Sequence, residues 1–81
     1  MSGIQSAVFE AIKAQQWFEK TKGKFNFSLS QFKEDIDLAA TRCLEQWPAS
    51  SDEQMKRTVI SVVKYMYDHE ESVERAMLYA K

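Results

Sequence analysis

The chain contains a single histidine, His69, the residue type that most often moves protons at neutral pH. Its neighbours in sequence are three carboxylates, Asp68, Glu70 and Glu71. Adjacent residues of a helix point in different directions, so this arrangement predicts a solvated helix start in preference to an acid–base site. The alternative is a proton-sensing histidine, because nearby carboxylates favour the charged imidazole.

Cys43 is the only cysteine, so a disulfide within the chain is excluded and a reducing compartment is indicated. It lies between Ala39 and Trp47 on the apolar side of an amphipathic segment, where a thiol stays protonated and inert. One cysteine and one histidine do not supply the ligands of a tetrahedral zinc site. We therefore expect a structural cysteine and no metal.

Two glycines are too few for a phosphate-binding loop, a dinucleotide fingerprint or a nucleophile elbow. The carboxylates are dispersed along helix faces, as in Glu71 with Arg75, which are spaced for an ion pair one turn apart. The sequence thus predicts no catalytic residue, no cofactor and no small-molecule substrate, and we expect a protein that is not an enzyme.

The net charge is −1, unlike the strongly basic balance of non-specific nucleic-acid binders. Positive charge is most concentrated in three lysines with three aromatic residues close by in sequence: Lys20, Lys22, Lys24, Trp17, Phe18 and Phe25. Aromatic side chains beside a basic groove can hold single-stranded nucleic acid by base stacking. This motif is the basis of an alternative function, a nucleic-acid-binding regulator that uses Lys20, Lys22 and Lys24. The simpler interpretation is a solvated loop.

The 81 residues fit one domain, residues 1–81, and the low glycine and proline content favours long helices. Apolar residues recur every three or four positions, which predicts an all-α bundle of three to four helices. We expect these helices at about residues 3–20, 30–46, 51–67 and 70–80. The third helix has a wide apolar arc, so it should pack against two neighbours or against one neighbour and a second subunit.

Serine and proline mark several helix ends. Ser28 or Ser30 is the expected N-cap of the second helix, and Pro48 ends it. Ser50 or Ser51 is expected to cap the third. We expect a break near residues 68–70, with Asp68 capping the last helix, although residues 51–80 could form one long helix.

Two segments each allow two structural interpretations. After Ile12 the apolar stripe of the first helix weakens, so either this helix bends or Trp17 lies outside the core. In residues 21–29, Phe25, Phe27 and Leu29 alternate with polar residues. This spacing predicts an extended linker that pins two aromatic side chains onto the core, and the alternative is a strand that pairs across a dimer.

Aromatic residues make up 12% of the chain, and helical wheels place Trp17, Tyr65 and Tyr79 off the main apolar stripes. Tryptophan and tyrosine are enriched at the energetic centres of protein interfaces. We therefore expect a regulatory or adaptor protein that binds another protein and forms homodimers, using Trp17, Phe18, Phe25, Tyr65 and Tyr79. The alternative is that tertiary packing covers these rings. The chain shows no secretory signal and no membrane span, which favours the cytoplasm.

Overall fold

Three main helices, α1, α3 and α4, form the framework of this all-α protein in the computed structural model, which describes residues 3–23 and 27–79. They span Gly3–Lys13 (α1), Leu29–Gln46 (α3) and Asp52–His69 (α4). Two short helices complete the fold, Gln16–Thr21 (α2) and Val73–Met77 (α5). No helix in the described ranges is long and apolar enough to cross a membrane. The all-α prediction is confirmed, with a different division of the first and last helices.

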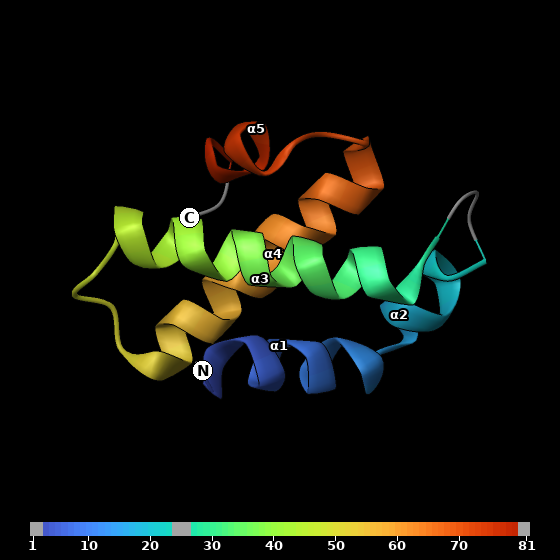
Figure 1. Cartoon of the computed structure of the whole chain (residues 1–81), viewed down its shortest axis with the longest axis horizontal. Helices are drawn as coiled ribbons and strands as arrows, with labels where there is room; N and C mark the ends of the chain where they lie inside the picture. The colour runs from blue at the N-terminus through green and yellow to red at the C-terminus, as the bar shows by residue number, and fades with distance from the viewer. Residues whose placement is uncertain (1–2, 24–26, 80–81) are drawn as a thin grey trace.

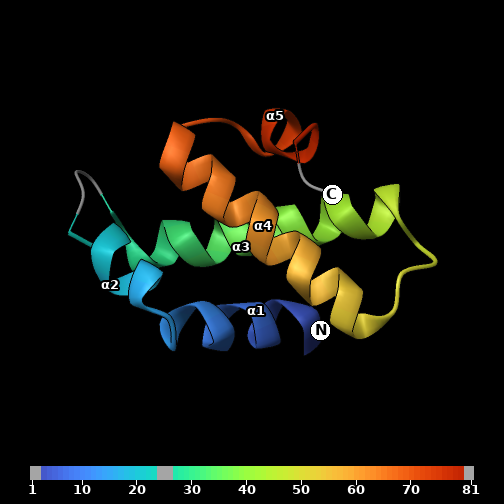
Figure 2. The same ribbon diagram turned by 180° about the vertical axis from the view of Figure 1, so that it is seen from behind.

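The three main helices pack on one another around a shared core. α1 and α3 lie side by side and α4 crosses them, as Figures 1 and 2 show from opposite sides. α5 packs on α3 and α4, on the side of α3 away from α1. The buried apolar residues come from all five helices: Val8, Ile12, Phe18, Phe32, Ile36, Ala39, Ala40, Cys43, Met55, Val59, Val62, Val63, Met66, Val73 and Ala76.

The expected first helix is divided in two, so the prediction of one helix over residues 3–20 is wrong. The backbone leaves helical geometry after Lys13, and Gln15 is extended, with φ −99° and ψ 150°. Successive helical residues are about 100° apart, so a straight continuation would turn Trp17 away from the face that contains Ile12. The break reorients α2, so that Phe18 is buried and Trp17 packs against the core.

Helices α3 and α4 begin and end as their local sequences require. The Ser28 hydroxyl accepts a hydrogen bond from the Gln31 amide at 3.3 Å, and α3 ends just before Pro48. The Ser51 hydroxyl caps α4 through the Gln54 amide at 3.2 Å. Each cap satisfies an amide that the helix itself leaves unpaired, which is typically worth about 1 kcal/mol.

The predicted break at the end of α4 is confirmed, but its cap differs from the prediction. Glu70 adopts the left-handed conformation, with φ 54° and ψ 47°, and ends α4 after His69. The N-cap of α5 is Ser72, whose hydroxyl accepts from the Arg75 amide at 3.3 Å, and not Asp68. The last helix therefore starts at Val73, since residues 70–72 form the turn between α4 and α5.

The expected extended linker is seen in part. Phe27 is half-buried and packs on the core, and Leu29 is already the first residue of α3. Phe25 and Lys24 lie outside the described residues. The described part of this segment contains no strand, so it gives no support to pairing across a dimer.

Candidate functional surfaces

Most of the aromatic side chains are buried or pack against the core. Phe32 is fully buried on α3 and is surrounded by five rings whose centroids lie 5.3 to 6.2 Å from its own: Phe9, Trp17, Phe18, Phe27 and Tyr67. These separations are the usual ones for favourable tilted and edge-to-face ring pairs. Phe18 is 7% exposed and has almost no surface to offer a partner. Tertiary packing therefore accounts for Phe18 and for much of Trp17.

Polar atoms at the edge of this aromatic cluster bond across helices. The Trp17 indole Nε1 donates to Asp68 Oδ1 at 3.1 Å, which joins α2 to the end of α4. The Tyr67 hydroxyl donates to Asp35 Oδ2 at 2.6 Å, which joins α4 to α3. Burial, followed by this bond to Asp35, raises the Tyr67 pKa, so the phenol stays protonated as a donor. These bonds place Trp17 in the fold and leave it half-buried.

Tyr65 and Tyr79, both predicted to contact a partner, are brought together at the surface. The Tyr65 ring stacks on the Tyr79 ring with centroids 4.9 Å apart, and on the imidazole of His69 at 3.9 Å. Nδ1 of His69 lies 3.2 Å from the Tyr65 carbonyl oxygen. Tyr79 is 54% exposed and Leu78, next to it in the chain, is 65% exposed. We call Tyr65, His69, Leu78 and Tyr79 the tyrosine surface.

A shallow hollow of about 270 Å³ lies beside Leu78, between α3 and α5. Its lining residues are Arg42, Glu45, Gln46, Glu74, Met77 and Leu78. Arg42 binds Glu74 of α5 at 3.2 Å and Glu45 of its own helix at 3.4 Å. The bond to Glu74, followed by the charge of Glu45, raises the Arg42 pKa. One guanidinium pairs with two carboxylates, so the hollow carries charges of both signs with a small negative excess.

Cys43 is buried as predicted, whereas His69 is the last residue of α4 and does not lie at the predicted helix start. Cys43 is fully buried, and burial raises its thiol pKa to about 11, so it is protonated at neutral pH and a poor nucleophile. His69 is exposed at the end of α4, where its ring covers Tyr65. Within residues 3–23 and 27–79 no cluster of three or more His, Cys, Asp or Glu residues could hold a metal ion.

The two described lysines of the basic segment lie on or just after α2. Lys22 Nζ lies 3.2 Å from a carboxylate oxygen of Glu19 and 5.6 Å from the centroid of the Phe18 ring. Lys20 is exposed. The Glu19 carboxylate thus offsets the charge of Lys22, which weakens the field that a phosphate backbone would meet.

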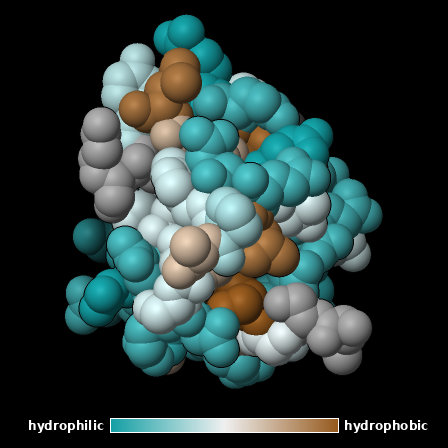
Figure 3. Space-filling view, turned by 90° about the vertical axis from the view of Figure 1, so that its left-hand side faces the viewer, coloured by the Kyte–Doolittle hydropathy of each residue, from teal (hydrophilic) through white to brown (hydrophobic). Residues whose placement is uncertain are grey.

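On the face that Figure 3 shows, the exposed apolar residues do not merge into one broad patch. Figure 3 views the end of the molecule where α3 finishes and α4 begins, and hydrophobic patches there are separated by hydrophilic and near-neutral residues. Leu44, which is 55% exposed, lies near the C-terminal end of α3. The stacked rings of Tyr65 and Tyr79 therefore stand out by their geometry and not by apolar area alone.

The sequence interpretation missed one surface, a groove between α1 and α3 that is lined in part by Phe9 and Lys33. Phe9 lies at the margin of the apolar stripe of its helix, where a helical wheel does not single it out. Lys33 lies 24 positions away in sequence, and only the side-by-side packing of α1 and α3 brings the two together. A helical wheel of either helix alone could not have found this groove.

No protein-family model, no curated protein and no solved structure matches the chain. The functional argument therefore depends on the residues and geometry described above.

Proposed function

We propose that this chain is a small, non-enzymatic regulatory or adaptor protein that acts by binding another protein and that associates with itself. The observation that carries the proposal is the stack of Tyr65 with Tyr79 and His69, together with the exposed Leu78, which precedes Tyr79 in the chain. Tyrosines are favoured at interfaces because each buries a large apolar area and keeps a polar hydroxyl.

The stack also reduces the cost of binding. A flexible side chain loses about 0.5–1.5 kcal/mol of conformational freedom when a partner immobilises it. Tyr65 is already held between His69 and Tyr79, so much of this ordering is complete in the free protein. Burying Leu78 fully would add about 1.5–3 kcal/mol of apolar stabilisation relative to a fully exposed side chain.

Self-association suits this region because its charges are of both signs and are paired with one another. Arg42 is paired with Glu74 and Glu45, and Arg75 is paired with Glu71 at 3.7 Å. A surface of one sign would repel a second copy of itself, whereas alternating charges allow two copies to approach in a two-fold arrangement.

Sedimentation equilibrium tests the proposal. We expect the wild type to sediment as a reversible dimer and Leu78→Ser to shift the protein towards monomer. Leu44→Ser is the matched control, because Leu44 is comparably exposed but does not line the hollow between α3 and α5. A wild type that stays monomeric at all concentrations, or a dimer that Leu44→Ser weakens equally, would contradict the proposal.

The nucleic-acid alternative has less support. Lys22 is engaged by Glu19, and Phe18, one of the aromatic residues on which stacking would depend, is buried. We therefore keep it as a competing outcome: salt-sensitive binding of single-stranded nucleic acid that Lys20→Gln weakens would favour it over the protein-binding proposal.

A further inference from the structure

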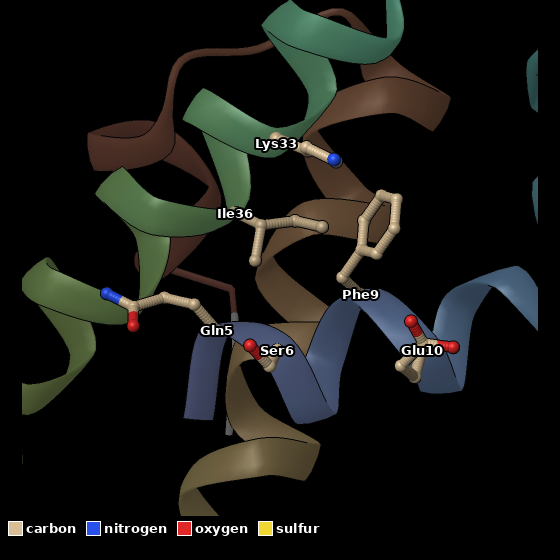
Figure 4. Close-up of a pocket in the computed structure, with 6 residues that line it drawn as sticks. All are labelled: Gln5, Ser6, Phe9, Glu10, Lys33 and Ile36. Atoms are coloured by element: carbon tan, nitrogen blue, oxygen red, sulfur yellow. The ribbon is translucent and has the colours of Figure 1, made fainter. Parts of the chain in front are cut away.

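A groove of about 330 Å³ runs between α1 and α3, on the opposite side of α3 from α5. We call it the α1–α3 groove, and its lining residues are Gln5, Ser6, Phe9, Glu10, Lys33 and Ile36. Figure 4 shows Phe9 from α1 and Ile36 from α3 approaching each other in the groove, with the Lys33 ammonium above the Phe9 ring. The groove thus combines an apolar floor with polar groups at its rim.

The polar side chains at the rim differ in whether another polar side chain pairs with them. Gln5 donates its side-chain amide to Asp37, and Glu10 is paired with Lys13 at 4.0 Å. Lys33 has no carboxylate within 4.0 Å among the described residues, and its Nζ lies 5.0 Å from the Phe9 ring centroid. The groove therefore offers one ammonium group whose charge is balanced only by an aromatic face and by solvent.

We infer that the α1–α3 groove binds an acidic segment of a partner protein, in which an Asp or Glu is adjacent to a large apolar side chain. The carboxylate pairs with Lys33, and the apolar side chain packs on the exposed part of Phe9, since Ile36 is only 1% exposed and has almost no surface to offer. Charge complementarity selects this occupant, because a cationic segment would meet Lys33 with like charge.

Glu10 sets the direction of the bound segment. Its carboxylate lies on α1 at the rim of the groove, and an acidic ligand placed beside it would be repelled. The carboxylate of the partner is therefore directed to the Lys33 side of the Phe9 ring. Because exposed ion pairs contribute little by themselves, the apolar contact and the charge pair must act together.

This inference goes beyond the self-association proposed above, because the two surfaces are separate. The tyrosine surface is formed by the end of α4 and the residues after α5, whereas the groove is formed by α1 and α3. α1 and α5 lie on opposite sides of α3 in both Figures 1 and 2. A protein bound in the groove would leave the tyrosine surface open, which is the arrangement that an adaptor needs.

Nuclear magnetic resonance titration of the full chain with two blocked dipeptides tests the inference. The probes are N-acetyl-Phe-Glu-amide and its neutral counterpart N-acetyl-Phe-Gln-amide. We expect amide shifts centred on Ser6, Phe9 and Lys33, and binding of the Glu peptide about two- to fivefold tighter, the factor typical of one exposed ion pair. This preference should shrink as the salt concentration rises.

Two charge-neutralising variants complete the experiment. Lys33→Gln should remove the preference for the Glu peptide, while Lys20→Gln, which removes another exposed charge, this one on α2, should keep it. Both changes are at exposed positions, so the fold is expected to persist, and the unperturbed part of the spectrum checks this. The absence of shifts at about 10 mM peptide, equal binding of both peptides by the wild type, or a preference that survives Lys33→Gln would overturn the inference.

Discussion

Replacing Phe32 by alanine tests whether the aromatic cluster around it stabilises the fold or instead contacts a partner. Phe32 is fully buried and contacts five rings, the nearest being Phe27 at 5.3 Å and Tyr67 at 5.4 Å. Truncating a buried phenylalanine to alanine usually lowers the free energy of unfolding by about 3–5 kcal/mol. Ring pairs add about 0.5–1.5 kcal/mol each, but they share one ring here and do not sum. We expect a loss of about 4–5 kcal/mol, the upper part of that range.

This loss is large beside the total stability. At the usual 0.05–0.15 kcal/mol per residue, an 81-residue chain unfolds with a free energy of about 4–12 kcal/mol. Phe32→Ala should therefore remove at least about a third of the free energy of unfolding, and at the lower end of this range the variant would be largely unfolded without urea. Phe9→Ala is the control, because Phe9 is half-buried and pairs with Phe32 at the rim of the cluster. Its expected cost is about 1–2 kcal/mol, since only part of the side chain leaves water.

Urea unfolding, followed by circular dichroism and by tryptophan fluorescence, measures both variants. Trp17 is a direct reporter, because its ring centroid lies 6.2 Å from that of Phe32. If Phe32→Ala costs no more than Phe9→Ala, the cluster does not stabilise the fold as described. The rings around Phe32 would then have to be explained by another role, such as contact with a partner.

Three further predictions concern the turn after α4 and two buried or half-buried titratable groups. Glu70→Gly should raise Tm by about 3–6 °C in a thermal melt, because glycine adopts a φ of 54° without strain; a lower Tm would show that Glu70 makes a compensating contact. Tyr67 has a raised pKa in the folded state, so its contribution to stability is present below the unfolded pKa near 10 and is lost as the pH rises above it. Relative to Tyr67→Phe, the wild type should therefore lose about 1.4 kcal/mol between pH 7 and pH 11 in urea unfolding, and a constant difference would contradict the buried phenol. Cys43, with a thiol pKa of about 11, should react with a disulfide reagent at pH 8 only as fast as the protein opens, and rapid labelling of the native protein would contradict its burial.

The sequence predicted the helices best where polar caps and apolar spacing agreed. Ser28 and Ser51, each one of two expected N-caps, cap α3 and α4 by accepting from the amides of Gln31 and Gln54, and Phe32 begins the buried face of α3. These are local relations, since the partner of each group lies within one helical turn. The turn at residues 68–70 was also visible, as a cluster of polar residues within an apolar stripe.

The division of the first helix was less accessible to sequence reasoning. Residues 13–16 contain neither glycine nor proline, so no local signal marks a break. The break is favoured by tertiary packing, because it places Phe18 and Trp17 against Phe32, which is 14 and 15 positions away. The same limit applies to the candidate surfaces. Tyr65 and Tyr79 were singled out one by one, and their stacking depends on the turn at Glu70 that returns the chain to α4.

The short length of α5 has a consequence for how often the tyrosine surface is available. A five-residue helix is not stable in isolation, so α5 persists only while Val73 and Ala76 stay docked on α3 and α4. Amide protons of this segment should exchange with solvent through local opening, well before those in the middle of α3. Tyr79 follows α5, so each opening separates it from Tyr65, and the apparent affinity of any ligand for the paired rings scales with the fraction of time that this end of the chain is closed.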